Sequence, residues 1–341
     1  MLRKSILFML AIMMVVLMVV PAAAQEAEVV ADGLVSPRGI AFDEEGNLYV
    51  AEAGSGGEKV LLEIEGATIS GGLTSQVSMI TADGGKSVAV GNLTSATDPF
   101  AGASLGVIRA LPVGDSLWLV LSDAQGMTVF SDAIVEIDKT TTRVRTYIDL
   151  RTYEEVNNPD GTEEILSNPA DIAIGPDGKL YIVDTGANTL LTWTAADGLQ
   201  LAHAWTDNPV PTSIEFAENG DIYIGFLGQG LAPGAAKIER WSADGSELLE
   251  TFPGLTNVTD ILVSADGSLY AVQMLMLGDQ GPVPDSGSVV LVTADGATPV
   301  LEGLNTPYGI AQDGEGNIFV TTNSAYGDPT AGSVVRVPAG S

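Results

Sequence analysis

The chain has 341 residues, no cysteine, one histidine, and 14 basic against 44 acidic side chains, which gives a formal net charge of −30 at pH 7. This balance excludes nucleic acid as a partner, because nucleic-acid binding depends on Lys and Arg neutralising phosphates, and it disfavours an anionic membrane surface. The missing cysteines exclude thiol nucleophiles and Cys-based metal sites, and a single His203 excludes a histidine-cluster zinc site.

Residues 1–24 have the pattern of a secretory signal peptide. Arg3 and Lys4 precede an apolar run over residues 6–20, and three alanines at 22–24 offer a small-residue cleavage site. The run is shorter than the ~18 residues of a spanning helix, although an uncleaved anchor stays open. We expect a secreted or periplasmic protein with no membrane attachment beyond this peptide, and one domain over residues 25–341.

A unit of two strands, first seen at residues 36–53 as SPRGIAFDEEGNLYVAEA, recurs along the chain. Its second strand begins at six positions: Leu48, Leu117, Leu180, Ile222, Leu269 and Ile318. In most units a second hairpin follows with an Ala-Asp-Gly turn, and Asp-Gly between apolar runs is a strong hairpin signal. Four short strands per unit predict an all-β protein, a six-bladed β-propeller.

The two ends of the repeat predict how the ring closes. The last unit ends after its third strand, SVVRV from Ser333, while residues 28–34, EVVADGL, resemble the fourth strands of other units. We expect this N-terminal strand to complete the last blade, since unpaired strand edges invite aggregation. No capped apolar stripe of helical period follows the signal peptide, so no helix is predicted.

Long connections on one side of the propeller form the expected working face, because binding residues concentrate on loops held by a rigid scaffold. These connections are residues 54–75, 122–133, 149–168, 226–236 and 274–287. In the third, a polar or cation-binding lip is one interpretation and a structured turn the other; its candidates are Asn157, Asn158 and Asp160. The last two connections carry an apolar loop face, formed by Phe226, Leu227, Met274 and Met276. It would bind a small aromatic or apolar molecule or a partner protein. Packing of the loops on one another is the alternative.

The segments SPRGIAFDEEGNLYVAEAG, TYEEVNNPDG, SNPADIAIGPDGKLYIVDTGANTLL and PTSIEFAENGDIYIGF resemble the ScyD/ScyE family of exported NHL-like propellers, named from cyanobacterial scytonemin biosynthesis. The resemblance implies a six-bladed extracytoplasmic propeller, and in the scytonemin setting its ligands would be aromatic indole and phenol compounds.

The chain is also distantly similar to regucalcin-type sugar lactonases and streptogramin lyases. A calcium-dependent lactonase of that kind implies Glu, Asn and Asp at the starts of the inner strands. In this chain the matching positions hold other residues, namely Arg38, Ala170, Thr212, Thr259 and Tyr308. We therefore expect no cofactor and no metal. Asp171 and Asp260, one residue along, leave a displaced calcium site open.

Three functions follow as hypotheses. The first is a non-catalytic scaffold that binds a ligand or a protein through the long-loop face. The alternative is a hydrolase or lyase whose acid–base chemistry would rest on carboxylates near the channel. Its candidates are Glu52 and Asp184, with Asn188 and Asn323 as polar companions. A structural envelope protein is the third. Arg38 and Tyr308 at the channel mouth would hold an anionic or aromatic ligand, with pairing to a local carboxylate as the plainer explanation for Arg38. For Glu52 and Asp184 the plainer explanation is bonding to the backbone of the neighbouring loop.

Overall fold

The computed structural model describes residues 27–64, 66–99, 102–122, 127–128 and 130–339. The predicted signal peptide lies outside this range. Within the described range, no helix is both long enough and apolar enough to cross a membrane.

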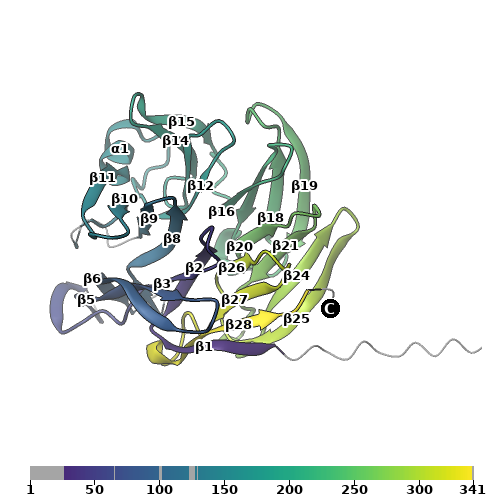
Figure 1. Ribbon diagram of the computed structural model, residues 1–341. Helices are drawn as coiled ribbons and strands as arrows, with labels where there is room; N and C mark the ends of the chain where they lie inside the picture. The colour runs from purple at the N-terminus through teal and green to yellow at the C-terminus, as the bar shows by residue number, and fades with distance from the viewer. Residues whose placement is uncertain (1–26, 65, 100–101, 123–126, 129, 340–341) are drawn as a thin grey trace, which may run out of the picture.

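The described residues form six larger antiparallel sheets and one two-stranded ribbon (Figure 1). The first sheet has β2 (Pro37–Phe42), β3 (Leu48–Glu52), β4 (Lys59–Ile64), β5 (Ala67–Ile80), β6 (Lys86–Asp98) and β7 (Ala103–Leu105). The second has β8 (Val107–Val113), β9 (Ser116–Leu121), β10 (Ala133–Asp138) and β11 (Val144–Asp149). The third has β12 (Pro169–Ile174), β13 (Leu180–Asp184), β14 (Thr189–Thr194) and β15 (Gly198–Ala204).

The other sheets follow the same order. The fourth has β16 (Pro211–Phe216), β17 (Ile222–Phe226), β18 (Ala236–Trp241) and β19 (Leu248–Leu255). The fifth has β20 (Val258–Val263), β21 (Leu269–Gln273), β24 (Gly287–Thr293) and β25 (Gly296–Leu304). The sixth has β26 (Ile310–Gln312), β27 (Ile318–Thr322), β28 (Gly332–Val337) and β1 (Glu28–Leu34). The ribbon is β22 (Leu277–Gly278) with β23 (Gly281–Pro282).

In several of the predicted hairpins an aspartate organises the turn between the first and second strands, as Asp43 does in the first sheet. The Asp43 side chain accepts hydrogen bonds from the backbone N–H of Glu45 and Asn47, at 3.0 and 2.8 Å. Gly46 has a φ of 80°, which a side chain would disfavour. The six predicted second strands are confirmed as β3, β9, β13, β17, β21 and β27.

The N-terminal strand joins the last sheet. β1 pairs antiparallel with β28, and Figure 1 shows these two ends of the described chain side by side. Each sheet also contacts the next through its inner strand, in the sequence β2, β8, β12, β16, β20 and β26, and β26 contacts β2. We call the region between these inner strands the central channel.

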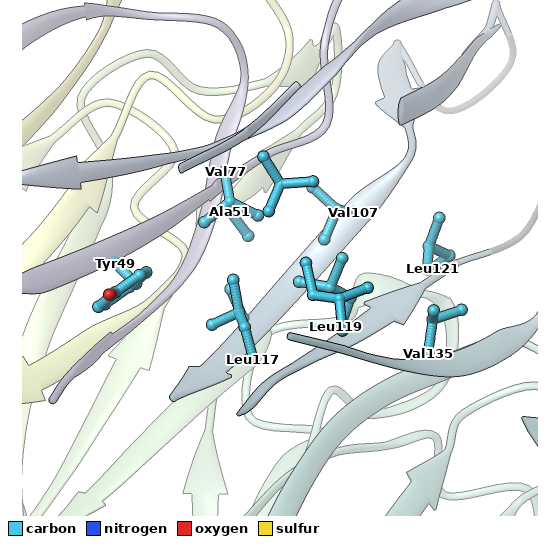
Figure 2. Close-up of a cluster of buried hydrophobic side chains, with 11 residues drawn as sticks. Tyr49, Ala51, Val77, Val107, Leu117, Leu119, Leu121 and Val135 are labelled. Carbon is cyan, nitrogen blue, oxygen red and sulfur yellow. The ribbon is translucent and has the colours of Figure 1, made fainter. Parts of the chain in front are cut away.

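The core lies between neighbouring sheets. Figure 2 shows one such layer, in which Tyr49 and Ala51 of β3 face Leu117 and Leu119 of β9. Because sheets pack on both of its faces, a second strand such as β3 or β9 is buried along its whole length.

Two expectations about loops are wrong. The connection at 54–75 is largely strand, because β4 pairs with an extended β5. The connection at 149–168 contains the helix α1 (Leu150–Asn157), which Asp149 caps by accepting from the Thr152 N–H at 2.9 Å. Two single-turn 3-10 helices also occur, η1 (Gln229–Leu231) and η2 (Pro329–Ala331).

Candidate functional site

The inner strands bring one equivalent position from every sheet to the central channel. In four sheets this position follows a register shift in the pairing with the second strand, and in the first sheet it lies within such a shift. An irregularity of this kind re-aims a side chain. The residues there are Gly39, Arg109, Asp171, Ser213, Asp260 and Gly309.

Arg109 spans the channel between two aspartates. Its Nε lies 3.0 Å from Asp171 Oδ1 and its Nη1 lies 3.1 Å from Asp260 Oδ2. β8 and β20 belong to sheets that are not neighbours, so the guanidinium bridges the enclosed space. Gly39 makes room for it, since a Cβ on Gly39 would lie 2.7 Å from Arg109 Cδ.

The two aspartates also tie neighbouring sheets together. Asp171 Oδ2 accepts from the backbone N–H of Ile214 at 3.0 Å, and Asp260 Oδ2 accepts from that of Ile310 at 3.0 Å. Each carboxylate therefore serves both the ion pair and the packing of the next inner strand.

Burial shifts the proton affinities in this group. Desolvation raises the pKa of Asp260 to about 7 and that of Glu215, on β16, to about 8, with Arg109 opposing both shifts. Burial also raises the pKa of Asp171. The pKa of Arg109 is raised, because Asp171, Asp260 and Glu215 outweigh the effect of its burial.

The side chains of Arg38 and Tyr308, which the sequence analysis selected, lie against each other. Arg38 Cζ lies 4.8 Å from the centre of the Tyr308 ring, and Arg38 Nη2 donates to the Ser104 carbonyl at 3.0 Å. Arg38 is 6 % exposed, and its Nε has no hydrogen-bond partner among the described residues. Burial lowers the pKa of Arg38 and raises that of Tyr308.

Arg38 has no carboxylate partner in the described part of the chain, unlike Arg109. A polar cavity of about 210 Å³ lies beside it and shares Ser104 with it. The polar side chains in its wall belong to Ser36, Ser55, Thr97, Ser104, Asn323, Tyr326 and Asp328. The Asp328 carboxylate accepts from the Thr330 N–H at 2.9 Å. An unpaired cation next to a hydroxyl-rich cavity is suited to an anionic, polar small molecule.

Glu52 and Asp184 lie buried at the ends of β3 and β13, with their oxygens held by neighbouring groups. Glu52 accepts from the Val35 N–H at 2.6 Å and from Gln76 at 2.9 Å. Asp184 accepts from the Ser167 hydroxyl at 2.6 Å and from the Asn168 N–H at 2.7 Å. These carboxylates fasten loops to strand ends.

The polar candidates of the 149–168 connection gather around the end of α1. Asn157 is exposed, and Asn158 ends the helix with a φ of 41°. Asp160 Oδ2 accepts from Asn188 Nδ2 at 3.1 Å. Asn188 in turn accepts from the Val210 N–H at 3.3 Å, so these side chains form a structured loop. Asn323 instead lines the polar cavity and accepts from Asn305 at 2.8 Å.

The four apolar loop candidates do not share an exposed face. Phe226 is the last residue of β17 and is fully buried, Met274 is buried, and Leu227 is partly buried. Only Met276 is open to solvent, at 48 % exposure. Packing of the loops on the sheets covers the others.

Sequence reasoning did not select Arg109 or Glu215, and it left the direction of Asp171 and Asp260 open. The available signal was a charged residue inside an apolar first strand, as in VIRAL and SIEFA. Among the described residues, no three or more His, Asp or Glu side chains are placed to hold one metal ion. Between Asp171 and Asp260, the cation is the guanidinium of Arg109.

No family model matches the chain, and no curated protein matches it. Solved structures do. A gluconolactonase from Xanthomonas campestris aligns with a TM-score of 0.57 and 12% identity over 91% of this chain and 88% of that one. The calcium-binding protein regucalcin from Agrobacterium tumefaciens aligns at 0.58 and 13%, over 92% and 93%. A streptogramin B lyase aligns at 0.53 and 13%, over 92% and 97%. At these identities the likeness concerns the fold, and this chain therefore has the propeller fold of the gluconolactonase and streptogramin lyase structures.

Proposed function

We propose that the six sheets are the blades of a closed, exported six-bladed propeller, and that it binds a small organic anion at the channel mouth and converts it as a hydrolase or lyase. The relationship to the ScyD/ScyE family is part of this proposal. It leaves the kind of organic anion open.

Arg38 carries the proposal. A buried cation without a counter-ion costs several kcal/mol, because the protein replaces only part of its hydration. A ligand carboxylate that accepts from the free Nε would offset this cost with a charge-assisted hydrogen bond. The adjoining cavity supplies polar groups that would orient the rest of the ligand.

Two groups that could transfer a proton, Tyr308 and Asp260, lie near Arg38 or interact with its neighbour. The ring of Tyr308 lies against Arg38, and its hydroxyl makes no hydrogen bond to another described residue. Tyr308 interacts electrostatically with Asp260, whose pKa of about 7 suits acid–base work near neutral pH. Glu215 lies on β16, two positions after Ser213, and interacts electrostatically with Arg109. The lyase and the gluconolactonase among the fold relatives support a hydrolase or lyase by analogy alone.

Binding without conversion is the second candidate, and one observation favours it. Asp260 Oδ1 accepts from the Ile261 N–H at 3.0 Å, while Oδ2 is shared by Ile310 and Arg109. Asp171 is engaged in the same manner. Carboxylates whose oxygens are all engaged in this way serve as structural ties, which favours binding without conversion.

Calorimetry with gluconate and benzoate, against glucose and benzyl alcohol as neutral counterparts, tests the binding step. We expect the anions to bind, and Arg38→Gln to weaken them about tenfold or more, since a charged hydrogen bond contributes roughly 1.5–3 kcal/mol. Arg143→Gln, at an exposed arginine, is the matched control. If none of the anions binds, or if both variants behave alike, Arg38 is not the anchor.

Product analysis with monoethyl succinate and monophenyl succinate, two esters that each keep a free carboxylate for Arg38, tests the conversion step. Turnover that Asp260→Asn abolishes while gluconate still binds supports the enzyme. Anion binding with no turnover of either compound supports the second candidate.

A further inference from the structure

A second cavity, of about 160 Å³, lies between the third and fourth sheets, and the channel does not use it. Its wall includes His203 of β15, Trp205 just after that strand, and Trp241 of β18. The wall also contains the aliphatic side chains of Leu190, Ile222 and Ile224, together with Tyr181, Thr192 and Ala202. None of these residues takes part in the Arg38 site.

The aromatic rings of this wall pack edge to face. The His203 ring lies between two indoles, with its centre 4.6 Å from that of Trp205 and 4.7 Å from that of Trp241. Trp205 is held from its other side by Phe226, at 5.2 Å and an interplanar angle of 84°. Rings fixed in this way favour an aromatic guest, because edge-to-face and offset contacts add to the burial of apolar area.

One residue of the wall carries a polar group without a partner. The Trp205 Nε1 is buried and has no hydrogen-bond partner among the described residues. The Trp241 Nε1, by contrast, donates to Glu239 Oε2 at 3.0 Å. A buried indole N–H is normally paired, so the free donor of Trp205 calls for an acceptor. Burial lowers the pKa of His203, which keeps its ring neutral at pH 7.

The size of the cavity limits the guest. An apolar cavity of about 150 Å³ takes up benzene, so the 160 Å³ here holds one aromatic ring with a small substituent. We propose that this cavity, which we call the aromatic cavity, binds a neutral single-ring aromatic molecule that carries one hydrogen-bond acceptor, and that the acceptor pairs with the Trp205 Nε1–H. The rim residues Lys179 and Asp244 leave the outer end polar.

Acetophenone and ethylbenzene test the proposal, because they have nearly the same shape and only acetophenone has an acceptor. We expect acetophenone to quench tryptophan fluorescence and to bind about fivefold or more tightly than ethylbenzene, the discrimination that one buried hydrogen bond supplies. Trp205→Phe keeps a ring and removes the donor, so the two affinities should become equal. Trp193→Phe is the control, since Trp193 packs against Trp118 at 5.8 Å and is outside the cavity.

A measurement on the unmodified protein covers the case in which Trp205→Phe does not fold. The chain has four tryptophans, so the indole N–H signals in a nitrogen–proton correlation spectrum are few. Acetophenone should shift the Trp205 signal downfield, and ethylbenzene should not. Equal affinities for the two compounds, no binding of either, or a Trp205 signal that acetophenone leaves in place would overturn the proposal.

Discussion

Glu154 shows how a single buried carboxyl sets a local pH dependence. It lies on α1 and is 1 % exposed, and neither of its carboxyl oxygens has a hydrogen-bond partner among the described residues. Burial, together with the nearby charges of Asp160 and Asp184, raises its pKa from an ordinary 4.5 to about 7. The folded chain therefore keeps a proton on Glu154 that the unfolded chain releases at lower pH.

Replacing Glu154 with Gln should reveal this linkage. Because the folded pKa is above the unfolded one, the wild type loses stability as the pH rises from about 4.5 to about 7, and the loss is complete above 7. A Gln side chain does not titrate. In urea unfolding, we expect the free energy of unfolding of Glu154→Gln to exceed that of the wild type by on the order of 3 kcal/mol at pH 8 and to equal it at pH 4. Glu163→Gln, at an exposed site, is the control, and a stability difference that is constant with pH would contradict the explanation.

At the scale of strands and helices, periodicity predicted what is local. The apolar first and second strands and their Asp-containing turns could be predicted, because residues close together in the sequence determine each hairpin. Helix α1 was missed because it has only eight residues and depends on the Asp149 cap and on packing. The Arg109 bridge was missed because its partner Asp260 lies 151 positions away, and only the assembled sheets bring the two together.

Arg109 joins three inner strands, so its removal should loosen them together. Arg109→Met leaves Asp171 and Asp260 buried without a cation, and breaking a buried pair from one side costs about 3–5 kcal/mol. We expect this loss in urea unfolding at pH 8 and a smaller one at pH 5, where the buried carboxyls take up protons. Asp171→Asn with Asp260→Asn in the same chain should restore part of the stability.

The surface offers a matched control for this experiment. Arg145 pairs with Asp138 at an exposed site, so Arg145→Met should cost less than about 1 kcal/mol. If Arg109→Met is as mild, or if the aspartate substitutions fail to rescue it, the bridge is not a source of stability.

Over the whole molecule, β1 ties the first residues described to the last sheet, and the first and sixth sheets also meet through β2 and β26. The stability of all the sheets should then depend on a strand that contributes little core of its own. Leu34, fully buried at the end of β1, is its main apolar anchor, whereas Val29 on the same strand is 58 % exposed. Substitutions at these two residues therefore measure what the packing of β1 contributes to stability, separately from what its pairing with β28 contributes.

We therefore expect Leu34→Ala to lower the free energy of unfolding by about 2–5 kcal/mol, as for other buried leucines, and Val29→Ala to change it by less than about 0.5 kcal/mol. A chain that begins at Val35 lacks the whole strand and exposes the edge of β28, so it should melt at a lower temperature than one that begins at Ala27 and should aggregate on standing. Calorimetry and light scattering report the two effects separately. Equal melting temperatures for the two chains would mean that β1 is an appendage, and that the contact between β2 and β26 alone holds the first and last sheets together.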